Sequence, residues 1–252
     1  MFTLTRLALA TAAALLVACG PAPKPRPKVK PYTPSFSYTA AQAAGPLDVT
    51  VGVVGAEFTG DGETWWRQNR DDEVARRMVA SLRASFTELL SRKGFRVAGP
   101  YDSLANMTFP EKKGSDLVLF ATLDITASAQ ASDQNTDASR NFLTGQVTTT
   151  QTCKIAYALQ GDISLIVKEP LSGEKMWVKR LEVMQKTQPV QVTGNACLGA
   201  GVPDGVEVKN AWARMHEATY KQVMGALDRY VSGEEFQVLQ RQAQELRAKK
   251  AY

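Results

Sequence analysis

Asp162–Met184 reads DISLIVKEPLSGEKMWVKRLEVM, and this stretch predicts two antiparallel strands joined by a tight turn. Its first part, Asp162–Lys168, and its last part, Met176–Met184, are rich in the branched and aliphatic residues that strands favour. Glu169–Lys175, between them, contains one proline and one glycine, which interrupt regular structure. We therefore predict a β-hairpin, and the rest of the fold is built outward from it.

Two further strand-like segments precede this hairpin. Lys154–Leu159 leads into it, and Asp116–Ala127 (DLVLFATLDITA) is strongly apolar. The stretch between these two segments, Ser128–Thr152, is rich in Ser, Thr, Gln and Asp. It predicts either a long loop or a pair of extended hairpin arms.

The first part of the domain predicts a strand, a helix and a second strand. Asp48–Phe58 is rich in valine and predicts a strand, followed by a polar loop over Thr59–Arg70. Two aspartates then open a helix that stops at Gly94, and Phe95–Ala98 gives a short second strand. The helix is indicated by apolar residues at helical spacing, namely Val74, Met78, Leu82 and Phe86.

The last part of the chain predicts two long helices. They follow Thr187–Gly205, a region with several Gly and Pro residues for which we predict no regular element. The first helix covers about Val206–Val231. Ser232–Glu235 has the pattern of a capping box that starts the second helix. The narrow apolar stripe of that helix either covers the sheet, which we favour, or docks on a partner.

Together these elements predict the fold class α/β (α+β) in a single domain, 46–252. We expect a mixed or antiparallel sheet of about five strands, with the long helices packed on one face.

The N-terminus predicts a bacterial lipoprotein signal peptide over residues 1–18. Arg6 precedes an apolar run, Leu7–Val17, and Leu16-Val17-Ala18-Cys19 has the order of a lipobox. Cys19 is then the lipidated residue (palmitate-type acyl chains), and it tethers the chain to a membrane outside the cytoplasm. Gly20, where an Asp would signal inner-membrane retention, favours the outer membrane. The alternative is an ordinary secretory signal with a chance cysteine.

Residues 19–45 predict a Pro/Lys-rich linker. Pro21–Pro34 reads PAPKPRPKVKPYTP, a pattern that favours extended polyproline II. It is a solubilising spacer or, in the sharper interpretation, a basic arm that contacts anionic headgroups or cell wall. This segment supplies most of the net charge of +5. The charge therefore does not indicate nucleic acid, which the compartment does not offer as a partner.

The remaining cysteines, Cys153 and Cys197, most often pair in an oxidising compartment. The loop that they close is worth roughly 4 kcal/mol in the chain-entropy model. Two separate buried thiols are the alternative.

No catalytic, cofactor or metal motif emerges from the sequence. His216 is the single histidine, and it lies beside the apolar stripe of a predicted helix, where a packed residue is the simpler interpretation. We therefore predict no catalytic residues, no metal and no cofactor. Trp65 and Trp66 are the candidate binding surface, because two adjacent aromatics in a polar loop can stack on a sugar or a partner protein. In the alternative, one of them folds onto the domain edge.

The order of these elements resembles the neuraminyllactose-binding hemagglutinin (HpaA-like) family of surface lipoproteins. The resemblance rests on Met78–Val97, which ends in Lys-Gly-Phe-Arg-Val, on the EPLSGE turn, and on the tail Leu239–Lys250. It implies an outer-membrane or surface lipoprotein linked to adhesion or to flagellar sheaths. The basic segment that the family associates with sialic acid corresponds here to Asp133–Arg140, with one basic and two acidic residues. We therefore do not carry sialic-acid binding over.

The sequence thus predicts a non-enzymatic outer-membrane lipoprotein held by its N-terminal lipid, adhesin-like or associated with the envelope or flagellar sheath, with a glycan or envelope protein as partner. The alternative is a periplasm-facing accessory lipoprotein that regulates an envelope machine such as a cell-wall synthase. A hydrolase is a third and weaker hypothesis.

Overall fold

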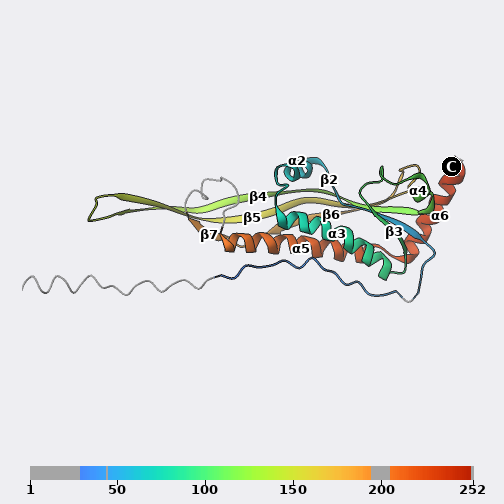
Figure 1. The fold of residues 1–252 in the computed structure, drawn as a ribbon, viewed down its shortest axis with the longest axis horizontal. Helices are drawn as coiled ribbons and strands as arrows, with labels where there is room; N and C mark the ends of the chain where they lie inside the picture. Colours follow the sequence, from blue (N-terminus) through green and yellow to red (C-terminus); the bar gives the residue numbers. More distant parts are fainter. Residues whose placement is uncertain (1–28, 44, 194–204, 251–252) are drawn as a thin grey trace, which may run out of the picture. The chain divides into compact units, whose positions relative to one another are not determined.

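The computed structural model describes residues 29–43, 45–193 and 205–250. The chain divides into two compact units, Met1–Lys30 and Pro31–Tyr252, and the described helices and strands lie in the second. In chain order these are β1 (Thr50–Val54), β2 (Glu57–Phe58), α2 (Gly60–Gln68), α3 (Glu73–Arg92), β3 (Arg96–Tyr101), α4 (Phe109–Gly114), β4 (Leu117–Arg140), β5 (Val147–Lys168), β6 (Lys175–Lys186), β7 (Val190–Thr193), α5 (Val206–Tyr230) and α6 (Gly233–Lys250) (Figure 1).

The strands form one mixed sheet, which has seven strands in the described part of the chain. The central order is β3-β1-β4-β5-β6. β1 is parallel to both β3 and β4, whereas β4, β5 and β6 are antiparallel neighbours. β2 continues the edge of β4 beyond β1, and β7 continues the edge of β5 beyond β6. This arrangement confirms the predicted single α/β domain with a mixed sheet.

Helix α3 forms where the apolar spacing predicts it. The side chain of Asp72 caps its start by accepting a hydrogen bond from the Ala75 amide at 3.0 Å. Gly94 follows its end with a φ of +87°, a backbone conformation that side-chain-bearing residues rarely adopt. These two residues fix the length of the helix that connects β1 to the parallel strand β3.

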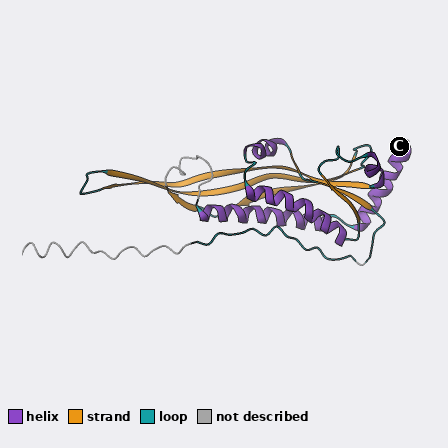
Figure 2. Ribbon diagram, viewed as in Figure 1, coloured by secondary structure: helices purple, strands orange, loops and turns teal. Residues whose placement is uncertain are grey.

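The main core lies between one face of the sheet and helices α3 and α5, which pack against each other on that side (Figure 2). The buried side chains of the strands and helices form one continuous cluster, which includes Leu119, Leu123, Ile163, Leu165, Leu82, Phe86, Tyr220 and Leu227. Burying such apolar side chains is the main favourable term in folding. The structure thus confirms that the long helices cover one face.

A smaller cluster covers part of the opposite face. Val118, Phe120 and Ile166 project there from β4 and β5, and Met107 packs on them from the segment before α4. β4 is therefore buried on both faces near its start. This explains why its sequence reads as a continuous apolar run rather than as alternation.

Helix α6 covers the sheet, as we favoured from its stripe. Phe236, Leu239 and Ala243 are buried in the main core. Ser232 accepts a hydrogen bond from the Glu235 amide at 3.2 Å, whereas the Glu235 carboxylate accepts one from the Trp177 indole at 2.7 Å. One half of the predicted capping box is thus present, and Glu235 binds the sheet. Among the described helices, none has the length and hydropathy needed to cross a bilayer.

The polar loop predicted over Thr59–Arg70 is wrong for most of its length, because Gly60–Gln68 is helix α2. The polar composition of this stretch suggested a loop. In the fold, a Cβ at Gly62 would lie 2.7 Å from the Leu123 carbonyl oxygen, so glycine allows α2 to pack directly on the backbone of β4. Tertiary packing therefore decides this helix.

Two other elements differ from the sequence prediction. The strand predicted over Asp48–Phe58 is broken at Gly55 and Ala56 into β1 and β2. Helix α4 was not predicted, and it begins with a capping box in which Thr108 and Glu111 satisfy each other's backbone amides. Its Thr-x-x-Glu signal was present in the sequence, but the helix is too short to show apolar periodicity.

The polar stretch Ser128–Thr152 forms extended hairpin arms, as one of the two predicted alternatives stated. β4 and β5 continue to pair up to Arg140 and Val147, with one irregularity in register between Ser132 and Asn135, and β7 pairs with β5 near the base of this ribbon. We call the part from Ala129 to Tyr157 the hairpin arm. Figure 1 shows it running on past the first turn of α5.

Residues 31–43, which we call the N-terminal strap, lie along α5. The Tyr32 amide donates to the Asn210 side chain at 2.6 Å, and the Tyr38 hydroxyl donates to Asp228 at 2.8 Å. Ala40 is buried. The compact unit begins at Pro31, so part of the segment predicted as a linker packs on the body.

Candidate binding site at the end of strand β1

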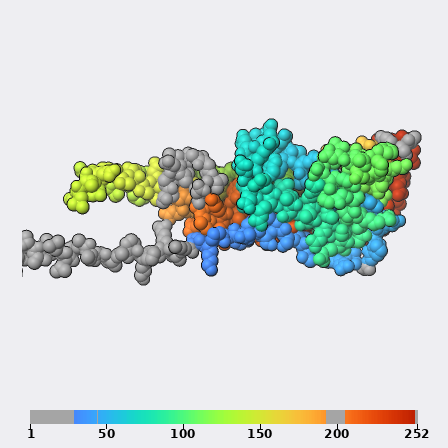
Figure 3. Space-filling model, viewed as in Figure 1, coloured from blue at the N-terminus to red at the C-terminus, as the bar shows by residue number. Residues whose placement is uncertain are grey.

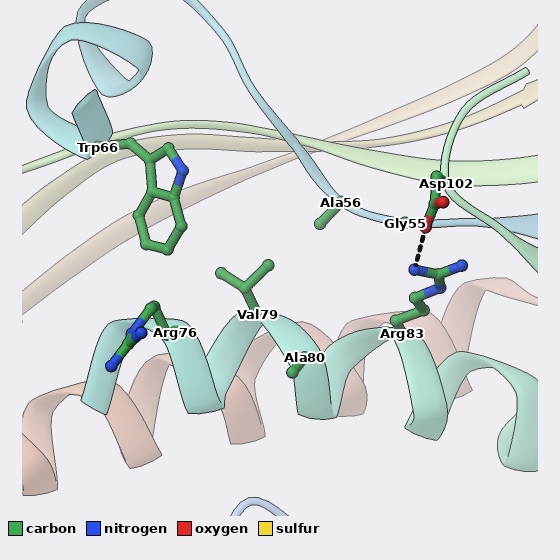
Figure 4. A pocket seen from close by; sticks show the side chains of 8 residues that line it. All are labelled: Gly55, Ala56, Trp66, Arg76, Val79, Ala80, Arg83 and Asp102. Atoms are coloured by element: carbon green, nitrogen blue, oxygen red, sulfur yellow. Dashed lines mark hydrogen bonds and ion pairs between the residues drawn. The ribbon is translucent and has the colours of Figure 1, made fainter. Parts of the chain in front are cut away.

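A pocket of about 240 Å³ lies beyond the carboxyl end of β1. From β1 the chain goes through α3 to β3 on one side, and from β3 it returns to β4 on the other side. Such a switch point leaves a crevice outside the carboxyl ends of parallel strands, and ligands of α/β proteins often bind there. The eight lining residues come from both connections and are Gly55, Ala56, Trp66, Arg76, Val79, Ala80, Arg83 and Asp102 (Figure 4).

The polar side of the pocket is an arginine-carboxylate pair. Arg83 Nη1 donates to Asp102 Oδ1 at 2.7 Å, and Nη2 donates to the Pro100 carbonyl at 3.0 Å. Its Nε is buried without a hydrogen-bond partner among the described residues. The pair is partly exposed, and it fixes the orientation of the guanidinium group at one end of the pocket more than it adds stability.

The other end of the pocket combines an indole with a second guanidinium group. Trp66 reaches down from α2 toward α3, where Val79 and Arg76 lie beneath it (Figure 4). Trp66 also stacks on Phe58 at 4.5 Å between ring centroids, with 11° between the planes. Arg76 is exposed and makes no ion pair with the described residues. An aromatic face beside a free cation suits a planar or ring-shaped ligand that carries oxygen acceptors.

The two predicted tryptophans have different environments. Trp66 lines the pocket, whereas Trp65 packs on the core, with its ring 6.3 Å from that of Trp212. Trp212 in turn donates its indole N–H to Asp72 at 2.6 Å. Trp65 thus matches the alternative in which one tryptophan folds onto the domain, whereas Trp66 lines the pocket, and its role in binding stays a prediction.

Arg76, Arg83 and Asp102 were not predicted from the sequence. The two arginines lie on the side of α3 that faces away from the core, and in the sequence they are indistinguishable from other charged residues of an amphipathic helix. Asp102 joins them only because β3 is parallel to β1 and ends at the same edge. No local signal in the sequence marks this convergence.

The residues of the pocket provide binding groups rather than an acid-base pair. His216 is not among the lining residues, it has 0 % exposure, and its Nδ1 is 3.0 Å from the Trp212 carbonyl oxygen. Burial lowers the pKa of His216 and so favours the neutral form of the ring. This confirms the packed interpretation. The described residues contain no group of three or more His, Cys, Asp or Glu side chains that could hold a metal ion.

The other predicted site residues are only partly described. Cys19 and Cys197 lie outside the described residues, so lipidation stays a prediction. Cys153 is buried in β5, where it pairs with Val192 of β7. The described segment 45–193 ends at Thr193, a few residues before Cys197 in the sequence, and its last strand, β7, pairs with the strand that holds Cys153. The Cys153–Cys197 disulfide stays a prediction that this register favours.

The structure gives a physical meaning to two motifs that carried the family resemblance. Glu169 of the EPLSGE turn is fully buried and accepts hydrogen bonds from the Leu171 and Ser172 amides. Arg247 of the C-terminal tail donates its Nε to the same carboxylate at 2.7 Å. The two motifs are far apart in the sequence and form one contact in the fold.

Comparison with known proteins gives structural neighbours and no family assignment. No family model matches the chain, and no curated protein matches it. Among solved structures, it is similar to a putative neuraminyllactose-binding hemagglutinin homolog from Helicobacter pylori, with a TM-score of 0.53 and 15% identity over 85% of this chain and 100% of that chain.

Two further similarities are weaker. A hypothetical protein from Chlamydia trachomatis gives a TM-score of 0.31 at 11% identity, covering 72% of this chain and 96% of that one. A lipoprotein from Neisseria meningitidis gives 0.19 at 14% identity, covering 70% and 99%. At these identities a likeness concerns the fold alone, and the two lower scores support no argument. The chain has a fold similar to that of the hemagglutinin homolog.

Proposed function

We propose that this chain is a non-enzymatic lipoprotein of the bacterial outer membrane that binds a glycan or a protein partner through the pocket at the end of β1. The observation that carries the proposal is the composition of that pocket. It offers an indole face, one unpaired guanidinium group and one oriented guanidinium group, with no nucleophile paired to a base. Such groups recognise rings and carboxylates but do not by themselves catalyse a reaction.

The size of the pocket limits the part of the ligand that it takes. Its volume of about 240 Å³ is below the range of about 300–1,000 Å³ that is usual for whole small-molecule ligands. It therefore accepts one sugar ring or one side chain of a larger partner. Both are consistent with a protein that acts by adhesion or as a component of the envelope or flagellar sheath.

The experiment places a photoreactive amino acid at Ala80, which lines the pocket, and at Ala84, which is exposed one turn later on the same helix. After irradiation of living cells, Ala80 should give a crosslinked glycan or protein that Ala84 does not give. Trp66→Ala should abolish this adduct and leave the circular dichroism unchanged. Identical adducts at Ala80 and Ala84 would show that the pocket is not the binding site.

A second function is a periplasm-facing accessory lipoprotein that regulates an envelope machine such as a cell-wall synthase. The small volume of the pocket favours it, because a single acidic side chain of a partner protein would fill the site. Protease treatment of intact cells separates the two. Cleavage in the exposed hairpin arm supports the surface function, whereas complete protection together with a periplasmic synthase in the Ala80 adduct supports the second.

A further inference from the structure

The tip of the hairpin arm exposes apolar side chains that nothing in the described chain covers. The exposed fractions are 102% for Phe142 and 97% for Leu143, and Val147 at the start of β5 is also exposed. Two hydrogen bonds at Asn141 close this turn, because its amide donates to the Gln146 carbonyl and its carbonyl accepts from the Gly145 amide. The turn is therefore formed, and it presents Phe142 and Leu143 together.

The arm behind this tip has a different composition. From Ser128 to Thr152 its side chains are mainly Ser, Thr, Gln, Asn and Asp, and nearly all of them are exposed. Between Ala138 and Thr152 the one charged residue is Arg140, which precedes the tip. An apolar end on a hydrophilic stalk, with a cation at the junction, has the composition of a segment that enters a lipid headgroup region. Figure 3 shows the arm as a narrow projection of the body.

The N-terminal strap leaves the body in the direction of this tip. Followed backward, the strap contacts Asp228 through Tyr38 and Asn210 through Tyr32, so it runs toward the first turns of α5. Trp212, two residues after Asn210 on α5, contacts the ring of Tyr157, whose strand partner is Ala129. The chain therefore enters the compact unit level with the base of the hairpin arm.

The length of the hairpin arm agrees with the reach of the segment that precedes the N-terminal strap. From Ala129 to Arg140 there are about a dozen residues, which span ~36–40 Å at the rise of a β-strand. From Cys19 to Pro31 there are also about a dozen residues, which reach at most ~40 Å. A tether of this length holds the base of the arm within one arm length of the lipid at Cys19.

We propose that Phe142 and Leu143 insert into the membrane leaflet that holds the Cys19 lipid, so that the hairpin arm is a second membrane anchor. This inference rests on the proposed function, because it uses Cys19 as the lipid attachment site. A tip that touches the same leaflet fixes the distance and the tilt of the body above the membrane, which a flexible tether alone does not fix.

The test uses the full lipidated chain in vesicles of phosphatidylethanolamine and phosphatidylglycerol, with part of the lipid brominated in its acyl chains. Phe142→Trp adds an indole at the tip, and Thr150→Trp adds one about 10 Å farther from the tip on the exposed arm. After subtraction of the parent emission, bromine should quench the Phe142→Trp signal by about half or more, because interfacial insertion reaches ~5–10 Å. The Thr150→Trp signal should not change.

Equal quenching at the two positions, or none at Phe142→Trp, overturns the proposal. So does a Phe142→Trp signal that depends on protein concentration but not on bromine, because a second copy of the chain then covers the tip. Mass spectrometry of the N-terminal peptide separates this result from a failure of the proposed function. An unmodified Cys19 refutes the lipoprotein assignment, whereas an acylated Cys19 with an unquenched tip refutes the second anchor alone.

Discussion

The two ends of strand β5 carry turns of opposite character. At one end the β4–β5 turn exposes Phe142 and Leu143 completely. At the other end the β5–β6 turn buries a carboxylate, that of Glu169, and pairs it with Arg247. β5 therefore begins in a projecting arm, and we call the turn with Phe142 and Leu143 its free end. The other end of β5 is held to α6 by the contact between Glu169 and Arg247, and we call it the pinned end. The difference shows that the composition of a turn does not predict its burial, since here two apolar side chains are exposed and one carboxylate is buried.

The largest expected effect on the free energy of unfolding comes from a substitution at the pinned end. Glu169→Ala removes the partner of Arg247 and the acceptor for two turn amides, so we expect a loss of ~3–5 kcal/mol in the free energy of unfolding. Urea denaturation measures it. Glu174→Ala is the matched control, because Glu174 forms an exposed ion pair with Lys250 from the same turn to the same helix. Its loss should stay below ~1 kcal/mol, and equal losses would contradict the assigned role of burial.

The next effect concerns the base of the arm. If Cys153 and Cys197 pair, Cys153→Ser should lower the free energy of unfolding by roughly 2–5 kcal/mol, and reduction of the parent should give a similar loss. Thiol counting under denaturing, non-reducing conditions provides the direct check. Two free thiols in the unreduced protein would support the alternative of separate buried cysteines.

Acid should weaken the pinned end through protonation of Glu169. Burial raises the pKa of Glu169, but hydrogen bonds from Ser172 and Leu171 and from Arg247 outweigh it, and the pKa lies below its ordinary value. A depressed folded-state pKa gives stability that is full above the unfolded pKa of about 4.3 and is lost as the pH falls through the folded pKa. Glu169→Gln should therefore flatten the decline of unfolding free energy between neutral and acidic pH. If Glu169→Gln left the decline of unfolding free energy unchanged, that decline would come from the protonation of other carboxylates.

The smallest expected effect is at the free end. Replacing both Phe142 and Leu143 with Ser should change the free energy of unfolding by less than ~0.5 kcal/mol, because neither side chain is buried. Urea denaturation without vesicles again provides the measurement. A loss comparable to that of Glu169→Ala would show that the tip folds back on the body in solution, and the contrast between the two turns would disappear.

Much of the fold follows from local patterns in the sequence. The apolar spacing of α3, the cap at Asp72 and the glycine at Gly94 are local signals, and they predict the helix correctly. The β5–β6 hairpin is equally local, because its strands are adjacent in the chain. Helix α2 was missed because its glycines make sense only against the backbone of β4. Packing between distant segments, which local propensity does not contain, decides such an element.

For the candidate site, too, some features follow from the sequence and others only from the tertiary structure. The sequence by itself determined the fold class, the paired tryptophans as unusual residues and the absence of a recognisable catalytic motif. The tertiary structure decided that Trp66 faces a pocket while Trp65 packs on Trp212, because α2 presents neighbouring side chains to different surroundings. It also joined Arg83 to Asp102, and Glu169 to Arg247. These contacts depend on which strand ends meet, and that follows from the parallel and antiparallel pairing of the whole sheet.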